Sequence, residues 1–299
     1  MKNNITRNFI LGSEWMYYKF YLGDKTSDTF LINILKPLIE IFIDRNYIDK
    51  WFFIRYADPE PHLRVRFQLK NTKFVTEISE LLYHELKFHM DTKAIHKVQI
   101  DTYKRELERY GTYTIEESES LFYLNSDFNL KLIEYSLDTK ERWLLGMKYI
   151  DIFLNDCGFN LSEKRGLFES LKTGFSLEFG ANKYTNKQLN EKYREARALI
   201  ISTLENSDNY FDIIMAQHTE LSKDFIKSIV DKGNSIDSSF RFNNTIDSFI
   251  HMHCNRLFQT KQRIHEWILY DFLFRYYDGK LARDKFDINK NNIGVSRKS

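Results

Sequence analysis

Cysteine, proline and long hydrophobic runs are all scarce in this sequence. The two cysteines, Cys157 and Cys254, are isolated and form no CxxC pair, which excludes a disulfide framework and a cysteine-rich metal site. No run of about 18 apolar residues exists, so we expect no membrane-spanning helix. The apolar stretch near the N-terminus is too short for a signal peptide. Together these absences predict a cytoplasmic protein.

Glycine is also scarce, and neither sign of charge is in large excess. The 299 residues include only 11 Gly and 3 Pro, while aromatic residues make up 16%. Few chain breakers and many large apolar side chains predict long regular elements around a well-filled core. The 44 Lys and Arg nearly balance the 42 Asp and Glu. The chain therefore lacks the broad basic surface of a protein that binds nucleic acid through phosphates, although a local basic pocket is compatible with this balance.

Strand signals are concentrated in the first third of the chain. The clearest is a hairpin over residues 51–69, WFFIRYADPEPHLRVRFQL, because two β-rich runs flank a connection that contains Pro59 and Pro61. From about Thr114 to Gly279 proline is absent and helical patterns follow one another. The predicted fold class is therefore α+β, with a small, mostly antiparallel sheet packed against a helical majority.

The same shift in composition predicts the domain organisation. We expect the strands and the helices to share one core. The predicted segments are a single α+β domain over 1–280, sheet-rich over about 9–112 and all-helical over about 113–279, and a polar tail at 281–299.

The second strand of the predicted hairpin carries alternating polar side chains. Because side chains of a strand alternate between its two faces, His62, Arg64, Arg66 and Gln68 share one face. The two guanidinium groups then lie about 7 Å apart, a spacing that can clamp a carboxylate or a phosphate. An ordinary solvated sheet face is the alternative interpretation. Arg55 lies on the partner strand, and its direction depends on the register of the pair.

The segment KRELERYG, residues 104–111, has a one-turn helical pattern. In a helix, Arg105 and Arg109 would stand one turn apart, with Glu106 three residues before Arg109. Glu106 could then hold the Arg109 guanidinium in position for a ligand. A surface ion-pair lattice explains the same pattern equally well.

The segment HMHCNRL, residues 251–257, lies in a strongly helical stretch. Asp247, His251 and Asn255 are spaced four apart and share a helix face. An aspartate one turn before a histidine can fix its tautomer and raise its basicity, as a general acid or base requires. A purely structural histidine is the alternative. His253 is only two residues from His251, so a two-histidine metal site is not expected.

Four segments together resemble a known family. In order and spacing, WMYYKFYLG, WFFIRYADPEPHLRVRF, YKRELERYG and SFIHMHCNRL resemble the C-terminal domain of class I lantibiotic dehydratases. The resemblance runs from about Phe9 to about Tyr277. The same domain occurs as a stand-alone protein in lanthipeptide and thiopeptide gene clusters. The chain is too short to hold the large glutamylation domain as well, so the resemblance implies that a separate, tRNA-dependent enzyme performs that step.

The resemblance implies a lyase. The partner enzyme esterifies Ser or Thr of a precursor peptide with glutamate, and this domain then eliminates the glutamate to leave dehydroalanine or dehydrobutyrine. The residues that match the functional set of the family are His251, Arg64, Arg66 and Arg109, with Arg105 as the second choice for the third arginine.

Further expectations accompany this reading. A supporting role at the substrate is expected for the following residues: Arg105, Glu106, Arg55 and Asn255. The absence of GxGxxG, P-loop and GxSxG motifs argues against a nucleotide cofactor and an esterase triad. No metal and no organic cofactor are expected. The expected partners are the glutamylated precursor peptide and the glutamylating enzyme, without direct nucleic acid binding, and a homo-oligomer is compatible with the sequence.

Two alternative functions stay open. Some stand-alone relatives in thiopeptide pathways join two dehydroalanines in a formal [4+2] cycloaddition that makes a pyridine ring. Those relatives generally lack the arginine and histidine set that this chain keeps. A non-catalytic scaffold that presents the precursor peptide is the second alternative.

Overall fold

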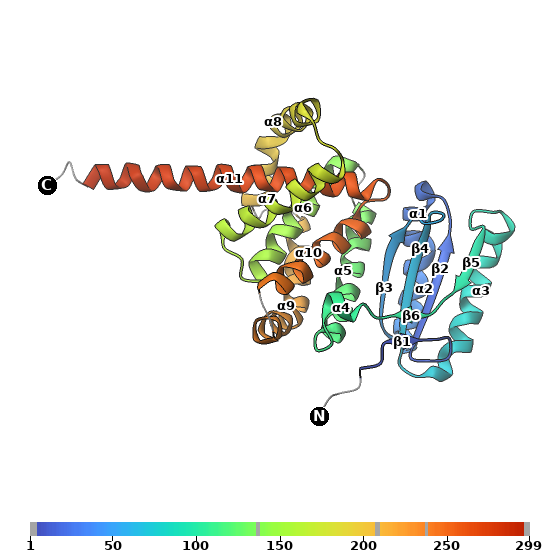
Figure 1. The fold of residues 1–299 in the computed structure, drawn as a ribbon. Coiled ribbons are helices and arrows are strands. Elements are labelled where there is room, and N and C mark those ends of the chain that lie inside the picture. Colours follow the sequence, from blue (N-terminus) through green and yellow to red (C-terminus); the bar gives the residue numbers. More distant parts are fainter. Residues whose placement is uncertain (1–4, 136–137, 207–209, 237–238, 296–299) are drawn as a thin grey trace. The chain divides into compact units, whose positions relative to one another are not determined.

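A computed structural model describes residues 5–135, 138–206, 210–236 and 239–295 of the chain (Figure 1). It is mostly helical with a small antiparallel sheet near the N-terminus, which confirms the α+β prediction. The chain divides into two compact units. The first comprises residues 1–142 and 214–262, and the second comprises residues 143–213 and 263–299. Within the described segments, no helix has the combination of length and hydropathy needed to cross a bilayer.

The first unit is built on a four-stranded antiparallel sheet with the order β3-β4-β2-β5. The predicted hairpin is present as β3 and β4, and Asp58-Pro59 in its connection is a cis peptide bond. The strands of this sheet are β2 (Trp15–Tyr21), β3 (Ile48–Tyr56), β4 (His62–Leu69) and β5 (Lys97–Ile100). A separate two-stranded pair is formed by β1 (Asn8–Phe9) and β6 (Tyr103–Lys104).

One face of the sheet forms the hydrophobic core of the first unit. Leu63, Val65, Phe67 and Leu69 alternate along β4 and are all buried on this face, as the period of two predicts. Burying each such side chain contributes about 1.5–3 kcal/mol. The core is completed by helices that follow β2 and β4, namely α1 (Asp24–Phe30), the π-helical turn η1 (Leu31–Leu35), α2 (Lys36–Asp44), the short 3₁₀ turn η2 (Thr72–Phe74) and α3 (Val75–Asp91).

The remainder of the chain is helical in the described residues. In chain order these helices are α4 (Leu107–Tyr110), α5 (Ile115–Tyr135), α6 (Thr139–Asp156), α7 (Leu161–Glu178), α8 (Lys183–Glu205), α9 (Tyr210–Ile236), α10 (Ser239–Leu257) and α11 (Gln262–Val295). The long helix α11 is drawn in red in Figure 1 and continues past Gly279. It therefore includes most of the predicted polar tail, because Lys, Leu, Ala and Arg after this glycine are good helix formers. The single-domain organisation over 1–280 stays a prediction.

One local prediction was wrong. In KRELERYG, only Leu107–Tyr110 is helical, so Arg105 and Arg109 do not stand one turn apart on one helix. The backbone N–H of Arg105 instead donates to the carbonyl of Arg7, 2.9 Å away, which continues the pairing of β6 with β1. The helix ends at Gly111, whose φ of 78° places it in the left-handed region that favours glycine.

The outer edge of β3 is covered by side chains of α5 and α10. The amide of Asn255 accepts from the backbone N–H of Arg55 and donates to its carbonyl, both at 2.8 Å. Ser126 accepts from the N–H of Phe53 at 3.2 Å, and Arg256 Nε donates to the Phe53 carbonyl at 2.8 Å. An edge strand is normally open to pairing with another chain. Here two helices satisfy its backbone and are thereby held in register with the sheet.

Candidate active site

Two arginines lie on the face of the sheet opposite the hydrophobic core. On β4, Arg64 pairs across the sheet with Lys19 of β2, and Arg66 pairs with Tyr17 of β2 and Phe52 of β3. We call this surface of β2, β3 and β4 the arginine face. The structure thus places Arg64 and Arg66 side by side on one face, as strand alternation predicts.

Arg66 is a buried cation in an aromatic cage. Its side chain is 9% exposed, and its guanidinium carbon lies 4.3, 5.0 and 5.1 Å from the ring centroids of Tyr17, Tyr103 and Phe52. Burial lowers the pKa of Arg66. Among the residues that the structure describes, no carboxylate lies within ion-pair distance of Arg66, although the charge of Glu106 acts on it from farther away, and its Nε has no hydrogen-bond partner. A buried charge without a counter-ion is costly, so this position is suited to an anionic ligand.

Arg64 is half-buried and therefore more exposed than Arg66. Its Nε donates to His62 Nε2 at 3.0 Å, and its guanidinium stacks on Tyr56 with a centroid distance of 3.5 Å. Lys19 stands directly opposite but is neutralised by an ion pair with Asp101. Within the described part of the chain, the two terminal amino groups of Arg64 donate to no protein acceptor. These groups are the fork by which an arginine binds a carboxylate.

Arg55 points to the opposite side of the sheet from Arg64 and Arg66. It pairs with Leu63, whose side chain is in the core. Its guanidinium donates to Asp28 Oδ1 and Ser27 Oγ, both at 2.6 Å, and to the Arg256 carbonyl at 3.0 Å. All three nitrogens are therefore occupied inside the protein. The amide of Asn255 is likewise occupied by β3, so we assign both residues to positioning rather than to substrate contact.

Arg105 and Arg109 have opposite environments. Arg105 is buried and forms a bidentate ion pair with Glu119, with both N–O distances 2.7 Å. Glu119 is 1% exposed and also accepts from the phenol of Tyr103 at 2.8 Å. Arg109 is exposed on α4, and its Nε lies 3.4 Å from Glu106, as the i,i+3 spacing predicts. Arg109 is therefore the arginine available to a ligand, whereas Arg105 is committed to the fold.

Helix α10 carries His251 and is joined to α4. Thr245 Oγ donates to the carbonyl of Arg109 at 3.1 Å, and the Phe249 ring lies 5.4 Å from Tyr110. His251 is half-buried and shares a helix face with Asn255, which binds the edge of β3. This arrangement fixes the helix turn of His251 relative to both α4 and the sheet.

A continuous aromatic cluster connects these elements to Arg66. Phe249 lies 5.7 Å from Phe122, which lies 5.3 Å from Phe52, one wall of the Arg66 cage. The strands and helices that carry Arg64, Arg66, Arg109 and His251 thus pack together within the first unit. Sequence reasoning did not find the aromatic cage, because its rings come from three strands. Tyr17 of the WMYYKFYLG segment could have indicated the cage, but only with knowledge of the register that places it opposite Arg66.

The second histidine of the HMH segment is a core residue. His253 is fully buried, and its Nδ1 lies 3.1 Å from Asn125 Nδ2 and 3.2 Å from Asn129 Nδ2. Burial lowers the pKa of His253 well below the ordinary value, so the ring is neutral. Across the described segments, no three His, Cys, Asp or Glu side chains are gathered as metal ligands would be.

A buried histidine on α9 predicts a loss of stability in mild acid. His218 packs edge-on against Phe128 at 4.8 Å, and burial lowers its pKa from 6.5 to about 4. The unfolded chain therefore binds a proton at a higher pH than the folded protein does. The free energy of unfolding should fall as the pH drops from about 6.5 to about 4, by at most about 3 kcal/mol for this group. Urea denaturation at neutral pH and near pH 5 measures this loss, and His218→Leu should reduce it; an unchanged pH dependence would contradict the assignment.

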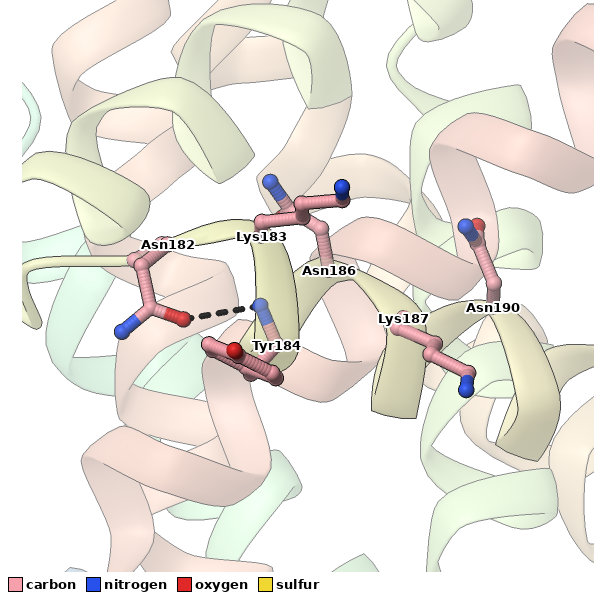
Figure 2. A pocket seen from close by; sticks show the side chains of 7 residues that line it. Asn182, Lys183, Tyr184, Asn186, Lys187 and Asn190 are labelled. Carbon is pink, nitrogen blue, oxygen red and sulfur yellow. Dashed lines mark hydrogen bonds between the residues drawn. The ribbon is translucent and has the colours of Figure 1, made fainter.

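Two hollows outside the arginine face lack a buried arginine or histidine in their lining. Figure 2 shows one of about 780 Å³ at the start of α8, where Asn182 Oδ1 accepts from the backbone N–H of Tyr184 at 2.9 Å. Its lysines and asparagines project from the exposed first turns of the helix. The other, of about 440 Å³, lies between α3 and strands β2 and β5 and is lined mainly by apolar side chains such as Leu86 and Val98.

Comparisons with known proteins identify the family. Residues 15–277 match the family model described as "Lantibiotic biosynthesis dehydratase C-term". The chain belongs to this family. The nisin biosynthesis protein NisB of Lactococcus lactis subsp. lactis is 26% identical over 271 residues, which are 89% of this chain and 25% of NisB. The subtilin biosynthesis protein SpaB of Bacillus subtilis is 25% identical over 270 residues, which are 86% of this chain and 25% of SpaB.

This member of the dehydratase C-terminal family spans about a quarter of the length of those relatives. Its fold is also found in solved structures. The tRNA-dependent lantibiotic dehydratase MibB from Microbispora sp. 107891 matches with a TM-score of 0.70 at 18% identity, over 94% of this chain and 29% of MibB. The pyridine synthase TbtD from thiomuracin biosynthesis matches with a TM-score of 0.65 at 10% identity, over 89% of this chain and 99% of TbtD.

Proposed function

We propose that this chain eliminates glutamate from glutamylated Ser or Thr side chains of a ribosomal precursor peptide, leaving dehydroalanine or dehydrobutyrine. The observation that carries the proposal is Arg66, a buried guanidinium with no carboxylate partner in the described residues. The family match and the biosynthetic relatives NisB and SpaB support a role in dehydration. A separate glutamylating enzyme, dependent on tRNA, would supply the substrate.

The proposed reaction breaks two bonds of the esterified residue. A base removes the α-proton, and the C–H electron pair becomes the new double bond between the α and β carbons. The bond from the β carbon to the ester oxygen breaks, and its electron pair leaves with glutamate as the γ-carboxylate. The developing negative charge on the adjacent peptide carbonyl and on the leaving carboxylate needs positioned donors.

The residue types on the arginine face suit these needs. His251 transfers the proton, in the direction of base or of acid. Arg66 binds a carboxylate of the glutamyl group, since its guanidinium is buried in the cage and no carboxylate of the described residues lies within ion-pair distance of it. Arg64 and Arg109 present guanidinium groups nearer to solvent and stabilise the charge that develops at the reacting carbons.

Replacement of His251 tests this proposal. His251→Ala should leave glutamylated peptide accumulating, with the elimination rate lowered by about 100-fold or more, the usual effect of losing a general acid or base. Mass spectrometry of a purified glutamylated Ser peptide incubated with the protein follows the loss of glutamate. His84→Ala, an exposed histidine on α3, serves as the control and should behave as the unaltered protein. Unimpaired dehydration by His251→Ala would contradict the assignment.

A second candidate function is a [4+2] cycloaddition between two dehydroalanines. The observation in its favour is the fold match to the pyridine synthase TbtD over nearly its whole length. A peptide that already contains two dehydroalanines, offered to the same protein, distinguishes the two reactions. Ring formation without glutamate loss would favour the cycloaddition. The absence of product in both assays would favour an obligate complex or a non-catalytic scaffold for the precursor peptide.

A further inference from the structure

The side chain of His62 is bonded at both ring nitrogens. Its Nδ1 lies 2.7 Å from the backbone carbonyl of Glu60, and its Nε2 lies 3.0 Å from Nε of Arg64. A carbonyl can only accept a hydrogen bond, and the Arg64 Nε–H can only donate one. Both bonds form together only when the ring is neutral with its proton on Nδ1.

The surroundings of His62 favour this neutral form. The ring is 4% exposed and stacks on Tyr21 at a centroid distance of 4.6 Å. Burial, together with the charges of Arg64 of its own strand, Lys19 of β2 and Lys97 of β5, lowers the pKa of His62, while the Glu60 carbonyl acts in the opposite direction. The Glu60 carboxylate is paired with His96, 2.9 Å away. Protonation of Nε2 would set a donor against the Arg64 Nε–H and break the contact.

The guanidinium of Arg64 is therefore held on two sides. His62 accepts from its Nε in the plane, and the Tyr56 ring lies 3.5 Å from the guanidinium carbon across its flat face. The His62 and Tyr56 rings are themselves 5.5 Å apart. These contacts leave the two terminal amino groups in a fixed orientation, and a fixed fork loses less entropy on binding a carboxylate.

We propose that His62 is a positioning residue that aligns Arg64 for the substrate by accepting its Nε–H as the neutral Nδ1–H tautomer. This inference rests on the proposed function, in which Arg64 stabilises developing charge. It assigns His62 an indirect role, because the ring reaches the reaction only through Arg64. The pH below which His62 takes up a proton then limits the alignment of Arg64 from the acid side.

Two substitutions at His62 separate hydrogen bonding from packing. His62→Gln keeps an acceptor at the reach of Nε2 but loses the ring, whereas His62→Phe keeps a ring against Tyr21 but loses the acceptor. We expect His62→Phe to lower kcat for elimination by about 10- to 100-fold with a smaller change in KM, since a misplaced catalytic group has effects of this size. His62→Gln should stay within several-fold of the unaltered protein. The reverse order, with Phe active and Gln impaired, would show a packing role and overturn the proposal.

The dependence on Arg64 provides the second arm of the test. Lysine has no donor at the Nε position, so in an Arg64→Lys background the change from His62 to Phe should have no further effect. A full additional loss in that background would overturn the proposal, because His62 would then act on something else.

A measurement that does not depend on enzymatic activity distinguishes failure of this inference from failure of the proposed function. Nitrogen NMR of the ¹⁵N-histidine-labelled protein should show His62 at neutral pH as the Nδ1–H tautomer, with a shift at Nε2 in Arg64→Lys. Observation of the Nε2–H or charged form would overturn the inference whatever the chain catalyses. If the tautomer is present but no glutamate is eliminated by the unaltered protein, the proposed function fails instead.

Discussion

Arg66→Met is expected to abolish glutamate elimination while leaving the protein at least as stable as before. Arg66 is buried among Tyr17, Phe52 and Tyr103 with no carboxylate partner in the described residues. Replacing a buried charge by an apolar side chain of similar volume is often neutral or stabilising by about 1–4 kcal/mol. The same replacement removes the buried charge that would bind the glutamyl group, which should lower kcat/KM by at least about 100-fold.

Urea denaturation and the elimination assay measure the two effects on the same sample. The matched control is Arg55→Met, because Arg55 is an equally buried arginine on the neighbouring strand. Its guanidinium binds Asp28, Ser27 and the Arg256 carbonyl, so its removal should cost about 3–5 kcal/mol of unfolding free energy. If Arg66→Met destabilised the protein as much as Arg55→Met does, Arg66 would be a structural residue and not a ligand site.

The two arginines of the KRELERYG segment should give opposite results. Arg105→Ala leaves the carboxylate of Glu119 buried without its bidentate partner, which should lower the unfolding free energy by about 3–5 kcal/mol. Arg109→Ala removes an exposed side chain, so stability should change by less than about 0.5 kcal/mol. Its elimination rate should fall by about 10-fold or more if Arg109 stabilises developing charge as the proposed function requires.

Thermal unfolding and mass spectrometry distinguish these outcomes. Activity of Arg105→Ala is compared at a temperature where the variant is still folded. Lys104→Ala, which removes a neighbouring exposed cation, controls for the general loss of positive charge. Full activity in Arg109→Ala would remove this arginine from the proposed site. Stability unchanged in Arg105→Ala would show that Glu119 finds another partner.

Local periodicity was sufficient to predict part of this site. The hairpin and the shared face of Arg64 and Arg66 follow from an alternation that any extended strand obeys. The side of Arg55 did not follow, since it depends on a register between two strands. The assignment of Arg105 also could not be predicted, because its partner Glu119 lies fourteen residues away on helix α5. Such pairings are set by packing and leave no periodic signal.

The difference between the two histidines of the HMH segment shows the same limit. Spacing alone predicts that His251 and Asn255 share a helix face, and the structure places Asn255 against β3. The burial and neutral state of His253 could be explained only once the positions of Asn125 and Asn129 on α5 were known. The packing inside the first unit therefore buries His253 completely, whereas His251 is half-buried.

The side chains that cover β3 have a consequence for how this protein tolerates sequence change. The side chains of Asn255 and Arg256 bind the strand through its backbone carbonyls and N–H groups. Any residue type with extended geometry offers those same groups. Substitutions along the strand therefore leave these contacts intact, except at Arg55, whose side chain also binds the Arg256 carbonyl. A substitution at Asn255 or Arg256, in contrast, removes side-chain hydrogen bonds to the strand. Asn255 and Arg256, which follow His251 in the chain, thus fix the position of the His251 helix turn along the sheet.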